Sequence, residues 1–560
     1  MTRLRYRIVL PLLVLLAFNA CKNKEPAPVV EISPADSLFS FMSLKVNSVF
    51  RGFHYTNVNK TPVIELLFSE DLDPDSFDSS LSLMDNAGSS AQFTTFIENG
   101  RILVVQPTGL KPITHYHLNI TTGLRSIKDG RLQSEVGVDL TTAIDSSDKF
   151  PRISDSALLT LVQQQTFKYF YDFGHPVSGM ARERNVSADV VTTGGSGFGV
   201  MALLIGVERK FITRIEALAR IHKIVDFLTH KAKRYHGAFP HWMNGVTGET
   251  VPFSPFDDGA DLVETSYMME ALLAARQYFN GTDTYETTLR NNINNLWRAV
   301  EWNWFRQKQN VLYWHWSPDF NFKMNLPIQG WNEAMGVYVL AASAPVDSNR
   351  ITKSVYDSGW ANNGIYKNGR SFYDITLPLG PEYGGPLFFS HFSFHAINPD
   401  SLKDAYVNNY YTQNQNQSLI NYRYCVANPQ NYNGYSYACW GLTASDNSHG
   451  YAAHSPTNDQ GVISPTAAIS SMPYTPWESM NALRFFYYKL GDKIWGQYGF
   501  TDAFNLTDIW FANSYLAIDQ GAEIVMIENY RTGLIWKLFM SCPEIKTGMK
   551  TLGFSSPHLN

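Results

Sequence analysis

The sequence predicts a mainly α-helical protein that is preceded by a smaller β-sandwich domain. At 560 residues, with 44% hydrophobic and 17% charged residues, the chain has enough apolar material for more than one core. Short alternating apolar runs occupy residues 31 to 145, whereas apolar residues recur at helical spacing over residues 154 to 545. Roughly a dozen helical segments in this second part predict a toroid of paired helices whose loops build one cleft.

The first 21 residues predict an export signal that ends in a lipid-modified cysteine. Arginines at positions 3, 5 and 7 precede the apolar run 8 to 18, which is too short to span a membrane as a mature helix. The small residue before Cys21 resembles a bacterial lipobox, from which Phe18 and Asn19 depart. We therefore expect lipidation at Cys21 and a polar tether over residues 22 to 30. The protein would be an outer-membrane lipoprotein, on the periplasmic or cell-surface face, held to the membrane by its lipid only.

Residues 31 to 145 predict a β-sandwich. Turn residues such as Asp73-Pro74 and Asn99-Gly100 separate short apolar runs at 63 to 68, 81 to 83, 102 to 105, 116 to 120 and 138 to 140. The segments 68 to 74 and 112 to 116 resemble bacterial immunoglobulin-like modules that precede exported enzymes. That resemblance implies a spacer or a docking module.

The helical part follows a linker over residues 146 to 153. Ser154 or Asp155 can cap a first helix that continues to Tyr171. Further helices are expected near 197 to 208, 213 to 231, 259 to 279, 283 to 304, 331 to 343, 402 to 422 and 477 to 490. The glycine-rich segment 194 to 199 lacks the strand and the lysine of a phosphate-binding loop, so we interpret it as a tight turn into a helix.

Composition excludes several kinds of partner. The net charge is −5 and no basic run is present, so we expect no nucleic acid to bind. The three cysteines beyond Cys21 have no metal-ligand spacing, and we predict neither a metal nor another cofactor. Cys425 and Cys439 either close a short disulfide loop or are buried thiols, like Cys542. Aromatic residues make up 14% of the chain, and their flat apolar faces with polar edges suit the binding of sugars. We also expect a monomer.

The strongest candidate for chemistry is the segment 257 to 265, with four carboxylates in eight residues. If a helix begins near Asp257, spacings of four and three place Asp257, Asp261 and Glu264 on one inward face. Burial and mutual repulsion would then raise at least one pKa, which suits proton transfer. The alternative is that Asp257 and Asp258 merely cap the helix, although Glu264 lies too far along it for that explanation.

A second candidate is Glu333, in the segment Gly330-Trp-Asn-Glu-Ala-Met335. It is expected in a first helical turn, where packing against Trp314, Trp316 or Trp331 would raise its pKa toward that of a general acid. The helix N-terminus would oppose this shift. The alternative is a capping-box glutamate.

Several loops mix aromatic rings with polar side chains, as sugar clefts do. The candidate binding residues of this protein are Arg184, His241, Trp242, Trp314, Trp316, Trp331, His391, Trp440, Asp446 and Asp519. A histidine beside an aromatic ring, such as His241 or His391, is however more often a structural residue.

Eight of these segments occur in the same order in glycoside hydrolase family 144, and the chain resembles that glucoamylase-like family over about residues 155 to 540. They are 167 to 171, 257 to 265, 314 to 318, 330 to 335, 384 to 389, 441 to 446, 463 to 468 and 527 to 530. The resemblance implies an (α/α)6 toroid that hydrolyses β-1,2-glucan with inversion and without a metal, either internally or by releasing sophorose from an end.

By motif, the resemblance implies that Glu333 is the general acid and that Asp257, Asp261 and Glu264 are essential cleft residues. Either Asp257 or Asp519, which follows Ile518, could be the base. Two other functions stay open at this point: a surface protein that binds glycans without cleaving them, and a hydrolase of an α-glucan.

Overall fold

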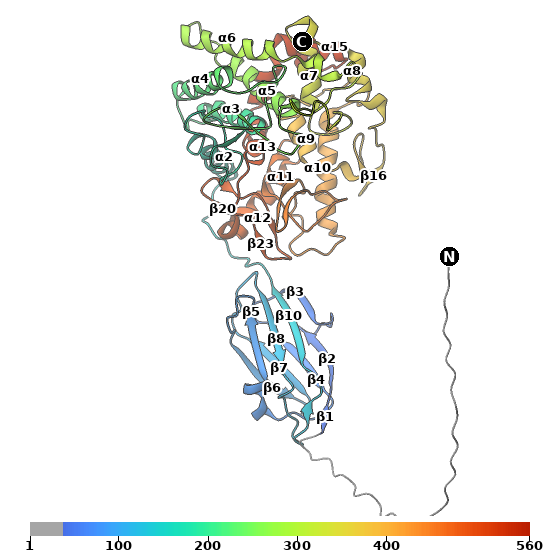
Figure 1. Ribbon diagram of the computed structural model, residues 1–560. Coiled ribbons are helices and arrows are strands. Elements are labelled where there is room, and N and C mark those ends of the chain that lie inside the picture. The colour runs from blue at the N-terminus through green and yellow to red at the C-terminus, as the bar shows by residue number, and fades with distance from the viewer. Residues whose placement is uncertain (1–36) are drawn as a thin grey trace, which may run out of the picture. The chain divides into compact units, whose positions relative to one another are not determined.

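The computed structural model describes residues 37 to 560, so the predicted signal, the lipidation site Cys21 and the tether lie outside the described residues. The chain divides into two compact units, a β domain and a helical domain (Figure 1). None of the helices within the described part combines the length and apolar composition that a membrane span requires.

The first unit is a sandwich of two four-stranded sheets, which confirms the predicted β-sandwich. One sheet has the order β3-β10-β8-β5 and the other β2-β4-β7-β6. The strands are β2 Phe41–Val46, β3 His54–Val58, β4 Ile64–Phe68, β5 Leu81–Asp85, β6 Phe93–Glu98, β7 Ile102–Pro107, β8 His115–Ile120 and β10 Val136–Thr142, and the short pair β1 Leu38–Phe39 and β9 Arg131–Leu132 lies beside them. Alternate residues point inward, as the buried Tyr116, Leu118 and Ile120 of β8 show.

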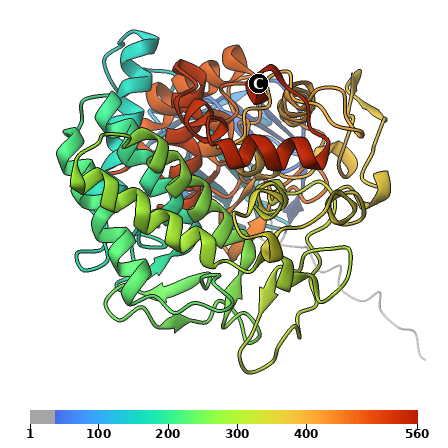
Figure 2. The ribbon, with the colours of Figure 1, turned by 90° about the horizontal axis from the view of Figure 1, so that it is seen from above.

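The second unit alternates outer and inner helices, which confirms the (α/α)6 toroid. Figure 2 looks down on it, and the chain colour runs around the ring from teal through green and yellow to red. The outer helices are α2 Asp155–Tyr171, α4 Arg214–His230, α6 Thr284–Ala299, α8 Lys353–Ser358, α10 Tyr410–Ala427 and α12 Pro476–Ile494. The inner helices are α3 Thr193–Glu208, α5 Leu262–Tyr278, α7 Met335–Ser343, α9 Phe388–Ser393, α11 Pro465–Ser470 and α13 Ala517–Arg531. Helices α14 Leu534–Met540 and α15 Pro543–Leu552 follow.

Burial separates the two rings. Every residue of α7 and α11 is buried, whereas α4 and α6 bury one face only. An outer helix therefore shows an amphipathic pattern and an inner one is enclosed by its neighbours. Cys425, Cys439 and Cys542 are buried free thiols, so the disulfide alternative is wrong.

Helix α3 corrects the interpretation of the glycine-rich segment, since residues 194 to 199 lie inside this helix and form no turn. A Cβ on Gly195 would lie 2.6 Å from the Cβ of Ala517, and one on Gly197 would lie 2.6 Å from the carbonyl oxygen of Tyr267. The glycines therefore let α3 pack closely between α5 and α13. This packing brings the N-terminal ends of the three inner helices together.

Short strands in the loops carry site residues at this end of the toroid. They are β11 Val190–Thr192, β12 Trp242–Asn244, β13 Thr250–Val251, β14 Ala260–Asp261, β15 His315–Trp316, β18 Ala444–Asn447, β19 Gly450–Ala453, β22 Phe504–Asn505 and β23 Trp510–Phe511. The remaining pairs are β16 Ser371–Phe372 with β17 Ile375–Thr376, and β20 Trp495–Gly496 with β21 Gly499–Phe500.

Candidate active site

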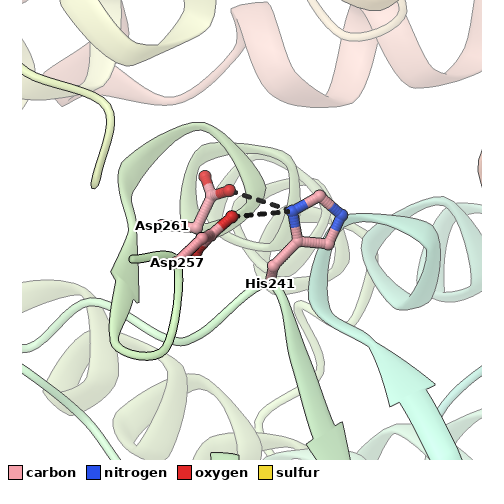
Figure 3. Close-up of side chains that lie close together, drawn as sticks. All are labelled: His241, Asp257 and Asp261. Atoms are coloured by element: carbon pink, nitrogen blue, oxygen red, sulfur yellow. Dashed lines mark hydrogen bonds and ion pairs between the residues drawn. The ribbon is translucent and has the colours of Figure 1, made fainter. Parts of the chain in front are cut away.

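A cluster of carboxyl groups surrounds His241 (Figure 3). The His241 Nδ1 lies 3.1 Å from Asp261 Oδ2 and 3.9 Å from Asp257 Oδ2, and its Nε2 lies 3.9 Å from Glu264 Oε1. His315 reaches the same group from strand β15, where its Nε2 lies 3.3 Å from Asp257 Oδ2. The three predicted carboxyl groups are thus brought together, and both Asp257 and Asp261 are buried.

The local structure differs from the predicted helical face. Helix α5 begins at Leu262, and Asp261 is its N-cap, whose Oδ1 accepts hydrogen bonds from the backbone of Val263 and Glu264 at 2.9 Å each. Asp257 lies in the loop ahead of β14. Neither Asp257 nor Asp258 caps the helix, and the carboxyl groups meet because a loop, a strand end and a helix converge.

Charge is shared unevenly within the cluster. Burial and the charge of Asp261 raise the pKa of Asp257 to about 8. Burial lowers the pKa of His241, but the carboxyl groups of Glu264, Asp261 and Asp257 outweigh it and raise that pKa to about 9. Although burial opposes the shift, the hydrogen bond from His241 and the charge of His315 lower the pKa of Asp261. At neutral pH the group therefore holds an imidazolium, an ionised Asp261 and a protonated Asp257.

The same atoms could hold a cation, because the ligand atoms of His241, Asp257 and Asp261 all lie within 4.8 Å of one another. Two aspartates and a histidine are a donor set that divalent metals accept. The histidine hydrogen bond already satisfies one of these oxygens, whereas the buried Asp257 Oδ1 has no hydrogen-bond partner in the protein. The donor set therefore fits either a shared proton or a metal ion.

Glu333 lies near this cluster on a separate segment. It precedes helix α7, which begins at Met335, so the predicted place in a first helical turn is wrong. Burial raises the pKa of Glu333 to about 7; its own backbone N–H lowers this pKa, and the charges of Asp261 and Glu264 raise it further. A carboxyl group with this pKa carries a proton for a large part of the time at neutral pH.

Two hydroxyl groups fix the backbone around Glu333. The Tyr267 hydroxyl donates to the Glu333 carbonyl oxygen at 3.1 Å, and the Ser393 hydroxyl donates to the Asn332 carbonyl oxygen at 2.8 Å. Ser393 also accepts from the Met335 backbone at 3.2 Å. Inner helices α5 and α9 thus hold the Glu333 segment from both sides.

A second carboxyl cluster forms at the start of α13. The Asp446 backbone donates to Asp502 Oδ2 at 2.6 Å, while the Asp446 carboxylate accepts from the Ser514 hydroxyl at 2.5 Å and pairs with Arg184 at 3.2 Å. Burial and Asp446 raise the pKa of Asp502 to about 7. Burial and the charge of Asp502 raise the pKa of Asp519 well above its usual range. Two buried carboxyl groups in this position share a proton.

The remaining sequence-predicted residues divide into two groups. Trp242, Trp314 and Trp316 are partly exposed around the first cluster, where Trp242 packs against His241 and Trp314 against His315. Trp331, His391 and Trp440 are buried and bonded within the protein. The Trp331 indole donates to Gln417, His391 shares a hydrogen bond with Ser471, and the Trp440 indole donates to the Glu478 carbonyl. These three side chains are therefore packed inside the protein, and their part in substrate binding stays a prediction.

Sequence reasoning missed His315 and Asp502. His315 lies between Trp314 and Trp316, and its short strand pairs with Asp261. This position between two tryptophans is the sequence feature that could have indicated a site residue. Asp502 stands in no recognisable motif. Only the fold brings it beside Asp446 and Asp519.

Comparisons with known proteins agree with this architecture. Residues 325–543 match the family described as "Putative glucoamylase", and residues 43–142 match the bacterial Ig-like domain. An exo β-1,2-glucooligosaccharide sophorohydrolase (non-reducing end) from Parabacteroides distasonis is 44% identical over 431 residues, which are 73% of this chain and 59% of that protein. The chain thus spans about three fifths of the length of this curated relative.

Solved structures are similar to this chain over 73% of its length. A protein from Bacteroides uniformis, described in the same words as the family, is 57% identical with a TM-score of 0.72, covering 73% of this chain and all of that one. The endo-β-1,2-glucanase from Chitinophaga pinensis, solved with sophorotriose and glucose, is 50% identical with a TM-score of 0.71 and the same coverage. The fold and the carboxyl clusters place this chain in the class of (α/α)6 toroid proteins that carry acidic residues at the ends of the inner helices. Within that class, the chain belongs to the glucoamylase-like family, glycoside hydrolase family 144, and carries a bacterial immunoglobulin-like domain ahead of it.

Proposed function

We propose that this protein hydrolyses β-1,2-glucan or its oligosaccharides with inversion of configuration. The observation that carries the proposal is Glu333, a carboxyl group with a pKa of about 7 on the same end of the toroid as two other carboxyl clusters. The relatives named above support the choice of linkage, since one acts on β-1,2-glucooligosaccharides and the other is a β-1,2-glucanase.

In this proposal Glu333 donates its proton to the glycosidic oxygen as the bond to the anomeric carbon breaks. A base on the opposite side takes a proton from the attacking water, and inverting enzymes keep about 6.5 to 9.5 Å between the two carboxyl groups for that water. Asp519 is the better candidate for this base. Burial and neighbouring carboxyl groups raise the pKa of both Asp519 and Asp257. Asp519, however, lies beside a second carboxyl group, Asp502, and a pair that shares one proton keeps one ionised oxygen that can accept another, whereas Asp257 contacts two histidines instead.

The proposal also includes the membrane anchor. Arginines 3, 5 and 7, the apolar run and Cys21 support export and lipidation, which would hold the toroid at the outer membrane. The immunoglobulin-like domain would then separate the toroid from its anchor.

Incubation with linear β-1,2-glucan, cyclic β-1,2-glucan and an α-1,4-glucan tests the proposed activity. Chromatography should show shorter oligosaccharides from the linear β-1,2-glucan and none from the α-glucan. Cleavage of the cyclic form would assign an internal mode, because a ring has no end, and sophorose alone from the linear form would assign an exo mode. A linear glucan of unchanged length would contradict hydrolysis and favour a glycan-binding protein. Parallel reactions with a chelator test whether the cation-compatible group at His241 contributes.

Tyr267→Phe is expected to lower kcat about 10-fold with little change in KM, because one hydrogen bond that orients the Glu333 segment is lost. The assay should compare glucan with a β-glycoside that has an activated aryl leaving group. That substrate needs little proton donation, so it should be cleaved almost normally if Tyr267 acts through Glu333.

Tyr474→Phe is the matched control, since it removes an equally buried hydroxyl, bonded to Asn414, away from the carboxyl clusters. It should leave both substrates unaffected. Equal losses on both substrates in Tyr267→Phe would show that the tyrosine has a general structural role.

A further inference from the structure

A pocket of about 560 Å³ lies beside the second carboxyl cluster. Hairpin β18–β19 forms one wall of the pocket. Strand β23 of hairpin β22–β23, with residues 512 to 514 after it, forms a second wall, and the segment 184 to 186 forms a third. These three segments are far apart in sequence. The pocket size is within the range of about 300 to 1,000 Å³ that small-molecule sites occupy.

Polar groups form one part of its lining. Arg184 donates through Nε to Glu183 and through Nη1 to Asp446, with ion-pair distances of 3.0 and 3.2 Å. Asp446 also accepts from Ser514, so its position is fixed from two directions. Behind it lie the buried carboxyl groups of Asp502 and Asp519, which share a proton.

Aromatic rings form the other part. Tyr451 projects from strand β19 opposite Asp446 and is 52% exposed, and Trp510 and Phe511 lie partly exposed on the facing hairpin. Exposed aromatic side chains on two facing hairpins offer flat apolar faces beside hydrogen-bonding groups. The C–H faces and the hydroxyl edges of a pyranose ring match this combination.

The charges of the pocket select among ligands. Arg184 is the cation of the lining, and two carboxylates, Glu183 and Asp446, already surround it. An anionic ligand such as a phosphate or a uronic acid would meet net negative charge there. A neutral polyhydroxyl ligand would instead find both donors and acceptors.

We propose that this pocket is a glucosyl-binding subsite, in which Trp510 and Tyr451 stack on a sugar ring and Arg184 and Asp446 bind its hydroxyl groups. The inference rests on the proposed hydrolase function and extends it. The pocket would bind a part of the glucan beside Asp519. Its position would determine how many glucosyl units an oligosaccharide needs for full affinity.

Titration of the full-length Glu333→Gln protein with β-1,2-gluco-oligosaccharides of increasing length tests the subsite. Adding Trp510→Ala should weaken the affinity for the longer oligosaccharides about 10-fold, which corresponds to about 1.4 kcal/mol of lost stacking. The affinity for the shortest oligosaccharide that spans the other subsites should stay unchanged. In the active protein, the same substitution should raise KM and leave kcat unchanged.

Trp477→Ala is the matched control, because Trp477 is 61% exposed in the first turn of α12 and does not line the pocket. It should bind like the parent at every length, and Tyr451→Phe should keep most of the affinity because the ring remains. Melting curves confirm that all variants fold. If wild-type protein cleaves β-1,2-glucan but Trp510→Ala binds every length like the parent, the subsite is refuted and the function stands. If wild-type protein cleaves no β-1,2-glucan, the function itself fails.

Discussion

Glu333→Gln is expected to lower kcat/KM on β-1,2-glucan about 10²- to 10⁴-fold, because glutamine cannot donate the proton that the leaving oxygen needs. In the wild-type protein the activity should fall as pH rises through about 7, since the acid works only while protonated. The variant should lose this basic limb of the pH profile. Initial rates between about pH 5 and pH 9 measure both effects.

Glu478→Gln is a suitable control for this experiment. Glu478 is partly exposed in the first turn of α12, and the same change of charge there should leave the rate and the pH profile unaltered. Near wild-type turnover of Glu333→Gln would remove Glu333 from the role of acid. Unchanged binding of oligosaccharide with no turnover would agree with that role.

Asp519→Asn should be similarly inactive, about 10²- to 10⁴-fold below wild type, because the attacking water would lose its base. Its activity should return in part with azide, an anion that attacks without giving up a proton. The rescued product should be a glycosyl azide of inverted configuration. Rates with and without azide, together with the stereochemistry of the product, measure this.

Asp257→Asn separates the two candidate bases. Asp257 touches the two histidines and carries its own proton, so we expect a partial loss of rate and no recovery with azide. If azide restores Asp257→Asn and leaves Asp519→Asn inactive, the base is Asp257.

Much of the fold follows from local patterns. The strands of the sandwich have alternating apolar residues, and outer helices such as α4 carry one apolar face, so their periods are visible in the chain. Inner helices such as α11 are buried on every side and show no such stripe. The glycines at the start of α3 indicate a turn when only the sequence is considered. The close packing that they permit depends on partners that are distant in sequence.

The amino-acid sequence by itself determined the two-part architecture, the family and the segments that carry the carboxyl groups, since these depend on composition and on short-range order. The tertiary structure alone decided which groups meet. It placed Asp261 at a helix cap, brought His315 to Asp257, and assembled Asp446, Asp502 and Asp519 from three separate segments. It also buried Trp331, His391 and Trp440. The physical reason is that pKa values and binding surfaces depend on charge, burial and contact over a few ångströms in space, and these are set by the packing of segments far apart in the chain.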